Sequence, residues 1–142
     1  MPKTQELYDQ DFNLWAEEMA AALRARHMEA VDFEHVAEEI EDLAKRNQRE
    51  LENRITRILE HLLKLRLAKG LILEYNQRSW HASIVRQQNE IDSLLRESPS
   101  LGHLIDPELI QACYQQAAAV VTAEYGVEPP ADCPFQRGDV LL

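Results

Sequence analysis

Residues 33–69 read FEHVAEEIEDLAKRNQRELENRITRILEHLLKLRLAK, a run without proline or glycine in which apolar residues return every three or four positions. That spacing is typical of an amphipathic helix. Acidic residues gather at its start and basic residues towards its end, which complements the partial charges of a helix dipole. The segment therefore predicts one long helix over 33–69, or two helices that are nearly collinear.

One row of apolar residues follows this helix. Ile40, Leu51 and Leu62 are eleven residues apart, so the row is not a strict heptad repeat and globular bundle packing is expected. At about 1.5 Å per residue the helix would be roughly 55 Å long, whereas a compact domain of this size is about 40 Å across. Three solutions stay open: a kink near KRNQRE (residues 45–50), an elongated monomer, or a second subunit that covers the overhang.

The apolar set broadens in the second half of the helix, from residue 55 onward. A wider apolar face indicates burial on more than one side. This half is therefore expected to be either the central helix of the bundle or a dimer face. The predicted interaction face consists of Ile55, Leu59, Leu63 and Leu67.

Further helices are predicted on both sides of the long one. They are expected at about residues 9–26, 79–97 and 107–125, and residues 71–78 can continue as helix for a turn or two after an end or bend at Gly70. The tail, residues 127–142, is rich in proline and is expected to be irregular. The predicted fold is all-α: a single domain, residues 1–142, built as an up-and-down bundle of four to five helices with one long central helix and an irregular Pro-rich C-terminal tail.

Composition narrows the function classes. The chain has 142 residues, of which 45% are hydrophobic, and a formal net charge of -10. That charge opposes binding to phosphate backbones or anionic lipids. No apolar run approaches the roughly 20 residues of a membrane span, and the start of the chain lacks the pattern of a secretory signal. The protein is therefore expected to be cytoplasmic, without a membrane partner.

Several polar residues are candidates for chemistry. His35 with Glu38, Glu39 and Asp42 has the helical spacing of a metal site, although an acidic first turn that complements the helix dipole is the simpler interpretation. His61 and His81 could face each other near Glu60 or Glu74, as a general base or half of a zinc site, or could be boundary residues with local hydrogen bonds. The predicted polar cluster consists of Glu38, Glu39, His61, Arg78 and His81.

Other motifs are weak or missing. No Glu-x-x-His occurs, which disfavours a carboxylate-bridged di-metal bundle. No phosphate-binding loop or nucleophile motif occurs either, so no metal or cofactor is predicted. Cys113 falls on an apolar stripe and is predicted to be core, with a disulfide to Cys133 as the less favoured alternative. The basic residues of the long helix alternate with Glu50 and Glu60, which favours a ladder of salt bridges over a nucleic-acid surface.

Five segments together resemble one known family. They are LYDQDFNLWAEE at 7–18, VAEEIEDLAKRNQREL at 36–51, HLLKL at 61–65, RSWHASIVRQQNEIDSLLRESPSL at 78–101 and ADCPF at 131–135. In order and spacing the chain resembles the domain-of-unknown-function family numbered 29, small proteins of cyanobacteria and some proteobacteria. The resemblance implies a small bacterial helical protein of the cytosol and carries over no activity, cofactor or catalytic residue. The polar residues within its motifs, Glu38, Glu39, Arg78, Arg86 and Glu90, are where a shared function would be sought.

Three functions remain open, and the favoured one is not enzymatic. It is an interaction or regulatory module that self-associates as a dimer through the apolar face between Ile55 and Leu73 and presents the acidic patch of residues 32–42 to a partner protein. The alternative is a metal-dependent enzyme with a His/Glu site in the bundle. A weaker alternative is nucleic-acid binding through the basic stripe Arg46, Arg57 and Lys64, with Arg49 and Arg54 at its sides.

Overall fold

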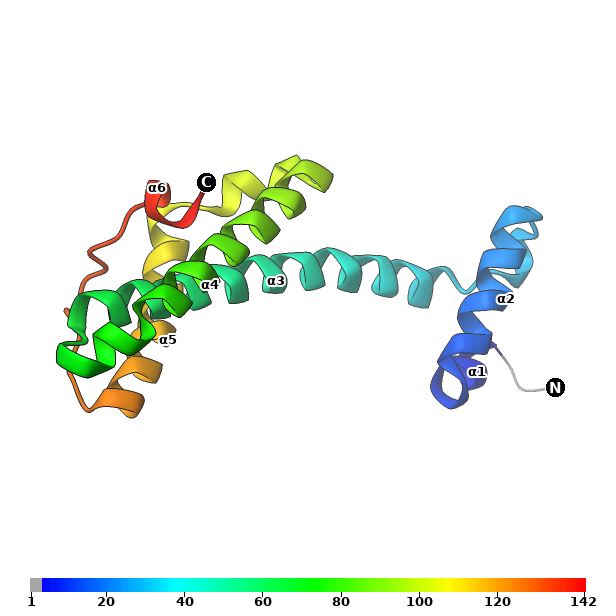
Figure 1. Cartoon of the computed structure of the whole chain (residues 1–142). Coiled ribbons are helices and arrows are strands. Elements are labelled where there is room, and N and C mark those ends of the chain that lie inside the picture. The colour runs from blue at the N-terminus through cyan, green and yellow to red at the C-terminus, as the bar shows by residue number, and fades with distance from the viewer. Residues whose placement is uncertain (1–3) are drawn as a thin grey trace. The chain divides into compact units, whose positions relative to one another are not determined.

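The computed structural model describes residues 4–142, and all the regular structure in that range is helical. In chain order the elements are α1 (Thr4–Gln10), α2 (Phe12–Arg24), the 3-10 turn η1 (Met28–Ala30), α3 (Phe33–Leu67), α4 (Gly70–Glu97), the 3-10 segment η2 (Pro99–Leu104), α5 (Pro107–Tyr125) and α6 (Arg137–Val140) (Figure 1). The prediction of an all-α protein with one long helix is confirmed. Among the described residues, no helix is both long and apolar enough to span a bilayer.

Contacts divide the chain into two compact units, and α3 runs through both. The first unit ends at Arg46, and the second comprises Asn47–Leu142. Each unit has a core of its own, so each is described separately.

The first unit is built from α1, α2 and the start of α3. Its core is a small cluster of Leu7, Trp15 and Met19, against which Val36 of α3 packs. Asp11 separates α1 from α2, since its side chain accepts a hydrogen bond from the Leu14 N–H at 3.0 Å and so caps α2. The helix predicted at about 9–26 corresponds to α2, which begins after Asp11, and α1 is a further short helix before it that was not predicted.

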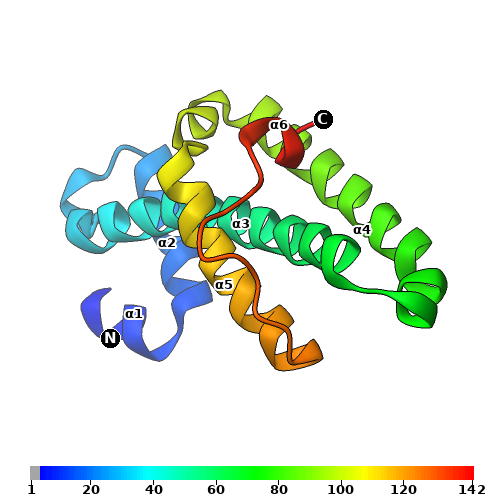
Figure 2. The same cartoon turned by 90° about the vertical axis from the view of Figure 1, so that its left-hand side faces the viewer.

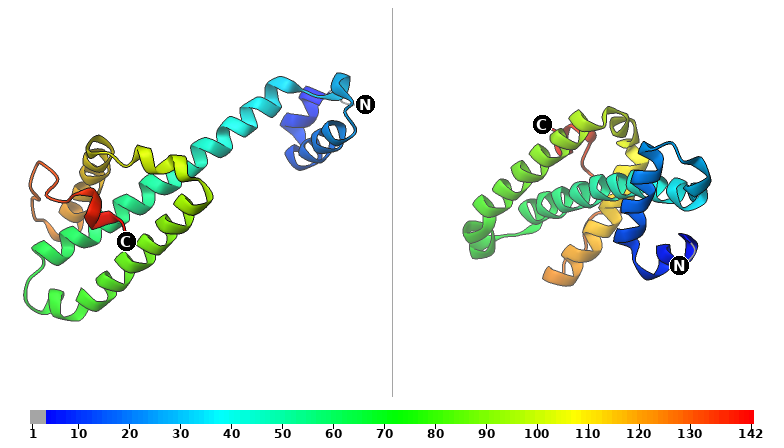
Figure 3. Two further views of the ribbon diagram at one scale, coloured as in Figure 1. Left: turned by 90° about the horizontal axis from the view of Figure 1, so that it is seen from above. Right: turned by 90° about the vertical axis from the view of Figure 1, so that its right-hand side faces the viewer.

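The second unit packs the rest of α3 against α4 and α5. Leu51, Ile55 and Ile58 of α3 meet apolar residues of the other two helices in one continuous core. α4 returns alongside α3, as the left-hand view of Figure 3 shows. α4 begins at Gly70 and not at residue 79, because Gly70 itself makes the reversal with a positive φ of 61° and the chain is helical again at once.

The C-terminal tail is tied to the second unit at several points. It passes along α5 (Figure 2), where Tyr114 donates a hydrogen bond from its hydroxyl to the Pro130 carbonyl at 2.5 Å. The tail is not wholly irregular, since α6 forms near its end and places Val140 in the core with no exposed surface. A single turn of helix is too short to leave a periodic signal, which is why the sequence does not reveal it.

Candidate functional site

The first part of α3 carries large apolar side chains that the described residues leave more than half exposed. Phe33, Ile40 and Leu43 are 58%, 61% and 54% exposed. At 3.6 residues per turn, Ala37 and Ala44 share their side of the helix. We call these five residues, Phe33, Ala37, Ile40, Leu43 and Ala44, the α3 stripe. Isolated exposed apolar residues are ordinary, but a row of them on one helix face marks an interaction surface.

The same helix segment also packs against α1 and α2 within the first unit. Val36 belongs to the core of the first unit, and Glu39 accepts a hydrogen bond from the hydroxyl of Tyr8 on α1. The stripe therefore borders the surface that α1 and α2 occupy, and Leu43 lies on the same side of α3 as Val36 and Glu39.

Charges along the stripe change sign from one end to the other. Glu34, Glu38 and Glu41 are exposed in the first three turns of α3, and they line a shallow hollow there. Lys45 and Arg46 follow and are exposed as well. The acids stabilise the helix start through its dipole. Because they are exposed, they are also free to meet a partner.

The start of α3 is held by a polar and aromatic cluster. Asp32 accepts a hydrogen bond from the backbone N–H of His35 at 3.3 Å, and its second oxygen lies 2.5 Å from His35 Nδ1. The His35 ring stacks on Tyr8 with the ring centroids 4.0 Å apart. Hydrogen bonding to Asp32 raises the pKa of His35 above its usual value, which favours the imidazolium. The bond to Glu39 raises the pKa of Tyr8 to about 12.

This cluster accounts for two residues that the sequence proposes as metal ligands. His35 is paired with Asp32 and Glu39 with Tyr8, so both are used in joining α1 to α3. Glu38 is exposed and acts on His35 through its charge. Among residues 4–142 no group of three or more His, Cys, Asp or Glu is placed so that it could hold a metal ion.

The predicted polar cluster does not assemble within the second unit. His61 is half-buried, and its Nδ1 has no hydrogen-bond partner. Burial lowers the pKa of His61, and the nearby Lys64 and Arg57 lower it further, so the ring is neutral. Arg78 and His81 are exposed on α4. Glu38 and Glu39 belong to the first unit.

An ion pair between a buried lysine and an exposed glutamate lies near His61. Lys64 Nζ is 2.8 Å from a carboxylate oxygen of Glu124 on α5, and the Lys64 side chain is buried. The same ammonium lies over the ring of Tyr125, with Nζ 5.9 Å from the ring centroid. Burial also raises the pKa of Glu60 in this region. The polar groups here hold α3 to α5.

The basic stripe of the long helix is broken up by these contacts. Lys64 is occupied by Glu124, and Arg54 contacts Glu50 and donates a hydrogen bond to Gln87 at 3.0 Å. What stays exposed is Arg46, Arg49 and Arg57. A phosphate backbone would therefore meet fewer basic groups than the sequence offers.

The predicted interaction face lies in the core. Ile55, Leu59 and Leu63 have no exposed surface, and Leu67 is half-buried against the same cluster. These residues are covered by α4 and α5 of their own chain, so they are not available to a second subunit. The broad apolar face was expected to belong either to a central helix or to a dimer interface, and in the structure it belongs to the central helix of the second unit.

Both cysteines are free thiols. Cys113 is buried on α5, as predicted, and burial raises its pKa. Cys133 is half-buried in the tail, where its backbone N–H donates to Gln111 Oε1 at 2.8 Å and its pKa is also raised by burial. A raised pKa means less thiolate at neutral pH, so neither thiol is activated for nucleophilic attack.

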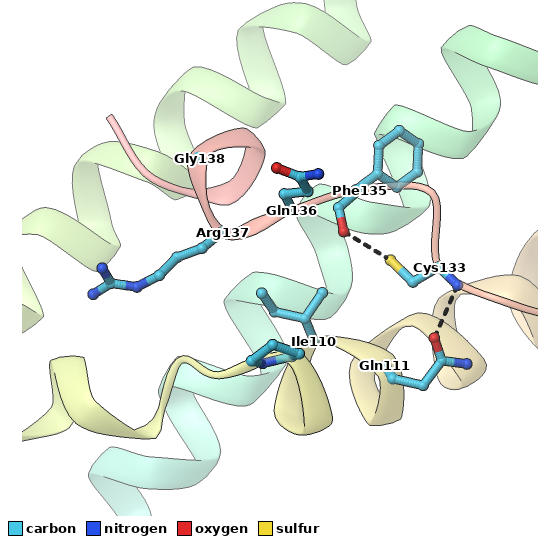
Figure 4. A pocket seen from close by; sticks show the side chains of 8 residues that line it. Ile110, Gln111, Cys133, Phe135, Gln136, Arg137 and Gly138 are labelled. Carbon is cyan, nitrogen blue, oxygen red and sulfur yellow. Dashed lines mark hydrogen bonds between the residues drawn. The ribbon is translucent and has the colours of Figure 1, made fainter.

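The tail and the start of α5 enclose a cavity. It has a volume of about 570 Å³. Figure 4 shows it between α5 and the tail, with Gln111, Cys133 and Arg137 on its walls; Pro107, Ile110, Phe135, Gln136 and Gly138 complete the lining. Both ends of the Gln111 amide are bound to the tail, at Cys133 N and the Ala131 carbonyl. The polar groups here serve to fasten the tail.

The sequence did contain a signal for the α3 stripe. Before residue 55 the apolar row is narrow and bordered by charges on both sides, whereas the apolar set beyond it is broad. A narrow apolar row with charged borders is typical of a helix that pairs with one other helix. A broad apolar face is typical of a helix that is buried in a globular core. The sequence shows this broadening, but the predicted interaction face lies in the broad part.

Comparison with known proteins gives one result. No curated protein matches the chain, and no solved structure does. A family model matches residues 7–142, which takes in the described helices almost completely and confirms the resemblance seen in the five sequence segments. The chain therefore belongs to the family described as Domain of unknown function DUF29.

Proposed function

We propose that this protein is a protein-protein interaction module that self-associates through the α3 stripe. One observation carries the proposal: three large apolar residues, Phe33, Ile40 and Leu43, are exposed on a helix whose neighbouring surface is already packed. Burying one such side chain completely stabilises an assembly by roughly 1.5–3 kcal/mol. Two copies that cover each other's stripes would gain several such contributions.

Sedimentation of the purified chain tests this. In the wild type, the mean mass should rise with concentration through the micromolar range. Ile40→Gln combined with Leu43→Gln should leave a monomer, because both side chains would put polar groups into the interface. Val85→Gln is the matched control: Val85 is an apolar residue of α4 that is 50% exposed and lies outside the stripe. A wild type that stays monomeric, or a stripe variant that assembles as the wild type does, contradicts the proposal.

Finer features of the sequence prediction belong to the same proposal. We retain the acidic patch of residues 32–42 as a surface for a partner protein, the single domain with an up-and-down bundle, and the cytoplasmic location. The patch is supported by the exposed carboxylates of Glu34, Glu38 and Glu41.

The two other functions have weaker support. An enzyme with a His/Glu site would have to use His61, whose buried Nδ1 has no hydrogen-bond partner among the described residues and lies near Lys64. Nucleic-acid binding would rest on Arg46, Arg49 and Arg57, which must overcome the net charge of -10.

A further inference from the structure

The distribution of charge and size along the α3 stripe selects a partner and an orientation. Glu34 stands near its start and Lys45 near its end, and both are exposed. Phe33 and Ile40 are large, whereas Ala37 and Ala44 are small. These two asymmetries distinguish the ways in which two such helices can lie together.

In a parallel pair, equal residues meet. Phe33 would face Phe33 and Ala37 would face Ala37, which alternates crowded and empty layers along the contact. The acidic starts would also lie side by side. Like charges at this distance repel each other and weaken the pair.

In an antiparallel pair, large residues meet small ones. Phe33 of one copy faces Ala44 of the other, and Ile40 faces Ala37, so that each of these layers holds one large and one small side chain. Leu43 lies opposite Glu34 in this register. The same register brings Glu34 beside Lys45 at both ends of the overlap. Close packing and opposite charges then favour the same arrangement.

We propose that the α3 stripe is covered by the stripe of a second copy of this chain, lying antiparallel in that register. This inference rests on the self-association proposed above and adds its geometry. The opposed helix dipoles of an antiparallel pair contribute in the same direction.

Cysteine cross-linking reads the orientation directly. Phe33→Cys and Ala44→Cys are made separately in a chain whose Cys113 and Cys133 are replaced by alanine and serine. In the proposed register, two copies of residue 33 are about 16 Å apart along the axis, from a rise of about 1.5 Å per residue, which is too far for a disulfide. Residue 33 of one copy and residue 44 of the other are opposite each other.

Mild oxidation of the mixed variants should therefore give the heterodimer, and oxidation of either variant alone should give monomer. If each variant cross-links to itself, the pair is parallel, and this inference fails while self-association stands. If sedimentation shows a dimer of these variants but no pair cross-links, the stripe is not the interface and the inference also fails. A chain that sediments as a monomer throughout ends both proposals.

Charge exchange gives a second measurement that leaves Phe33 in place. Glu34→Lys alone should weaken dimerisation by about tenfold, because two attractive exposed pairs become repulsive. Adding Lys45→Glu in the same chain should restore it. When the double variant is mixed with wild type, antiparallel copies should sort into two homodimers, since mixed pairs place like charges together. Preferential mixed dimers would show parallel pairing and overturn the inference.

Discussion

The two parts of α3 have the same kind of sequence and opposite surroundings. Ile40, in the first unit, is 61% exposed, whereas Ile55, in the second, has no exposed surface. Both lie on the apolar side of one helix. The comparison teaches that an amphipathic pattern specifies which face of a helix is apolar and leaves open what covers it.

The difference follows from the width of the apolar face. In the second unit Leu59 and Leu63 widen it enough for α4 and α5 to pack on it together. In the first unit one narrow row is left beside the surface that α1 and α2 use. A narrow row matches another single helix, which is the basis of the proposed antiparallel pair.

The largest expected effect comes from shortening one isoleucine in each part. Ile55→Ala should lower the free energy of unfolding by about 2–5 kcal/mol, because it leaves a cavity in a close-packed core. Ile40→Ala, at low protein concentration, should change it by less than about 0.5 kcal/mol, since an exposed side chain loses little. Urea denaturation of both variants measures this. Equal losses would mean that the two parts do not differ as described.

A smaller effect should follow from removing the helix caps of the two units. Asp32→Ala removes the cap of α3, and Asp106→Ala removes that of α5, where the side chain accepts from the Leu109 N–H at 2.8 Å. Each loss should cost about 1 kcal/mol. Hydrogen exchange should place the Asp32 loss in the first unit and the Asp106 loss in the second. Loss spread evenly over both units in either variant would show that the units unfold together.

Substitutions at the two positive-φ positions should change stability in opposite directions. Arg26 has a φ of 58° at the end of α2, and Gly126 has a φ of 65° at the end of α5. Arg26→Gly should stabilise the first unit by about 0.5–1 kcal/mol, and Gly126→Ala should destabilise the second by about 1 kcal/mol, because only glycine adopts this region without strain. Thermal unfolding checks both signs. A loss of stability on Arg26→Gly would contradict this account of the α2 end.

The stability of the first unit should depend on pH through His35. Because the folded-state pKa of His35 is raised, its pair with Asp32 stabilises fully below the unfolded value of 6.5 and loses this contribution as pH rises through the folded-state pKa. Hydrogen exchange of α1 and α2 amides, corrected for the intrinsic pH dependence, should therefore show weaker protection at mildly alkaline pH than at pH 6.

His35→Gln provides the control for that prediction. It should remove the pH dependence of α1 and α2 and leave exchange in α5 unchanged. A pH dependence that persists in this variant would assign it to another group and contradict the role given to His35.

Local chemistry made much of the fold predictable. Asp106-Pro107 and Gly126 are strong start and stop signals, and α5 has the bounds that they indicate. Gly70 was ambiguous, because a glycine that ends one helix can also begin the next. The predicted start at about residue 79 is therefore too late, since α4 is continuous from Gly70 to Glu97.

The candidate site was less predictable, because its contacts are distant in sequence. Tyr8 and Glu39, which form a hydrogen bond, are 31 residues apart in the sequence. No local sequence pattern predicts such a pair. His61 and His81 have a plausible spacing but differ in burial. The exposure of Ile40 depends on which helices pack nearby, and only coordinates give that.

The most direct test of the central claim is hydrogen exchange along α3 at increasing protein concentration. Amides of residues 37–44 should become more protected as copies pair, while amides of residues 55–63 should keep the same protection, since α4 and α5 cover them already. Protection of residues 37–44 that does not change across a wide concentration range would contradict the account.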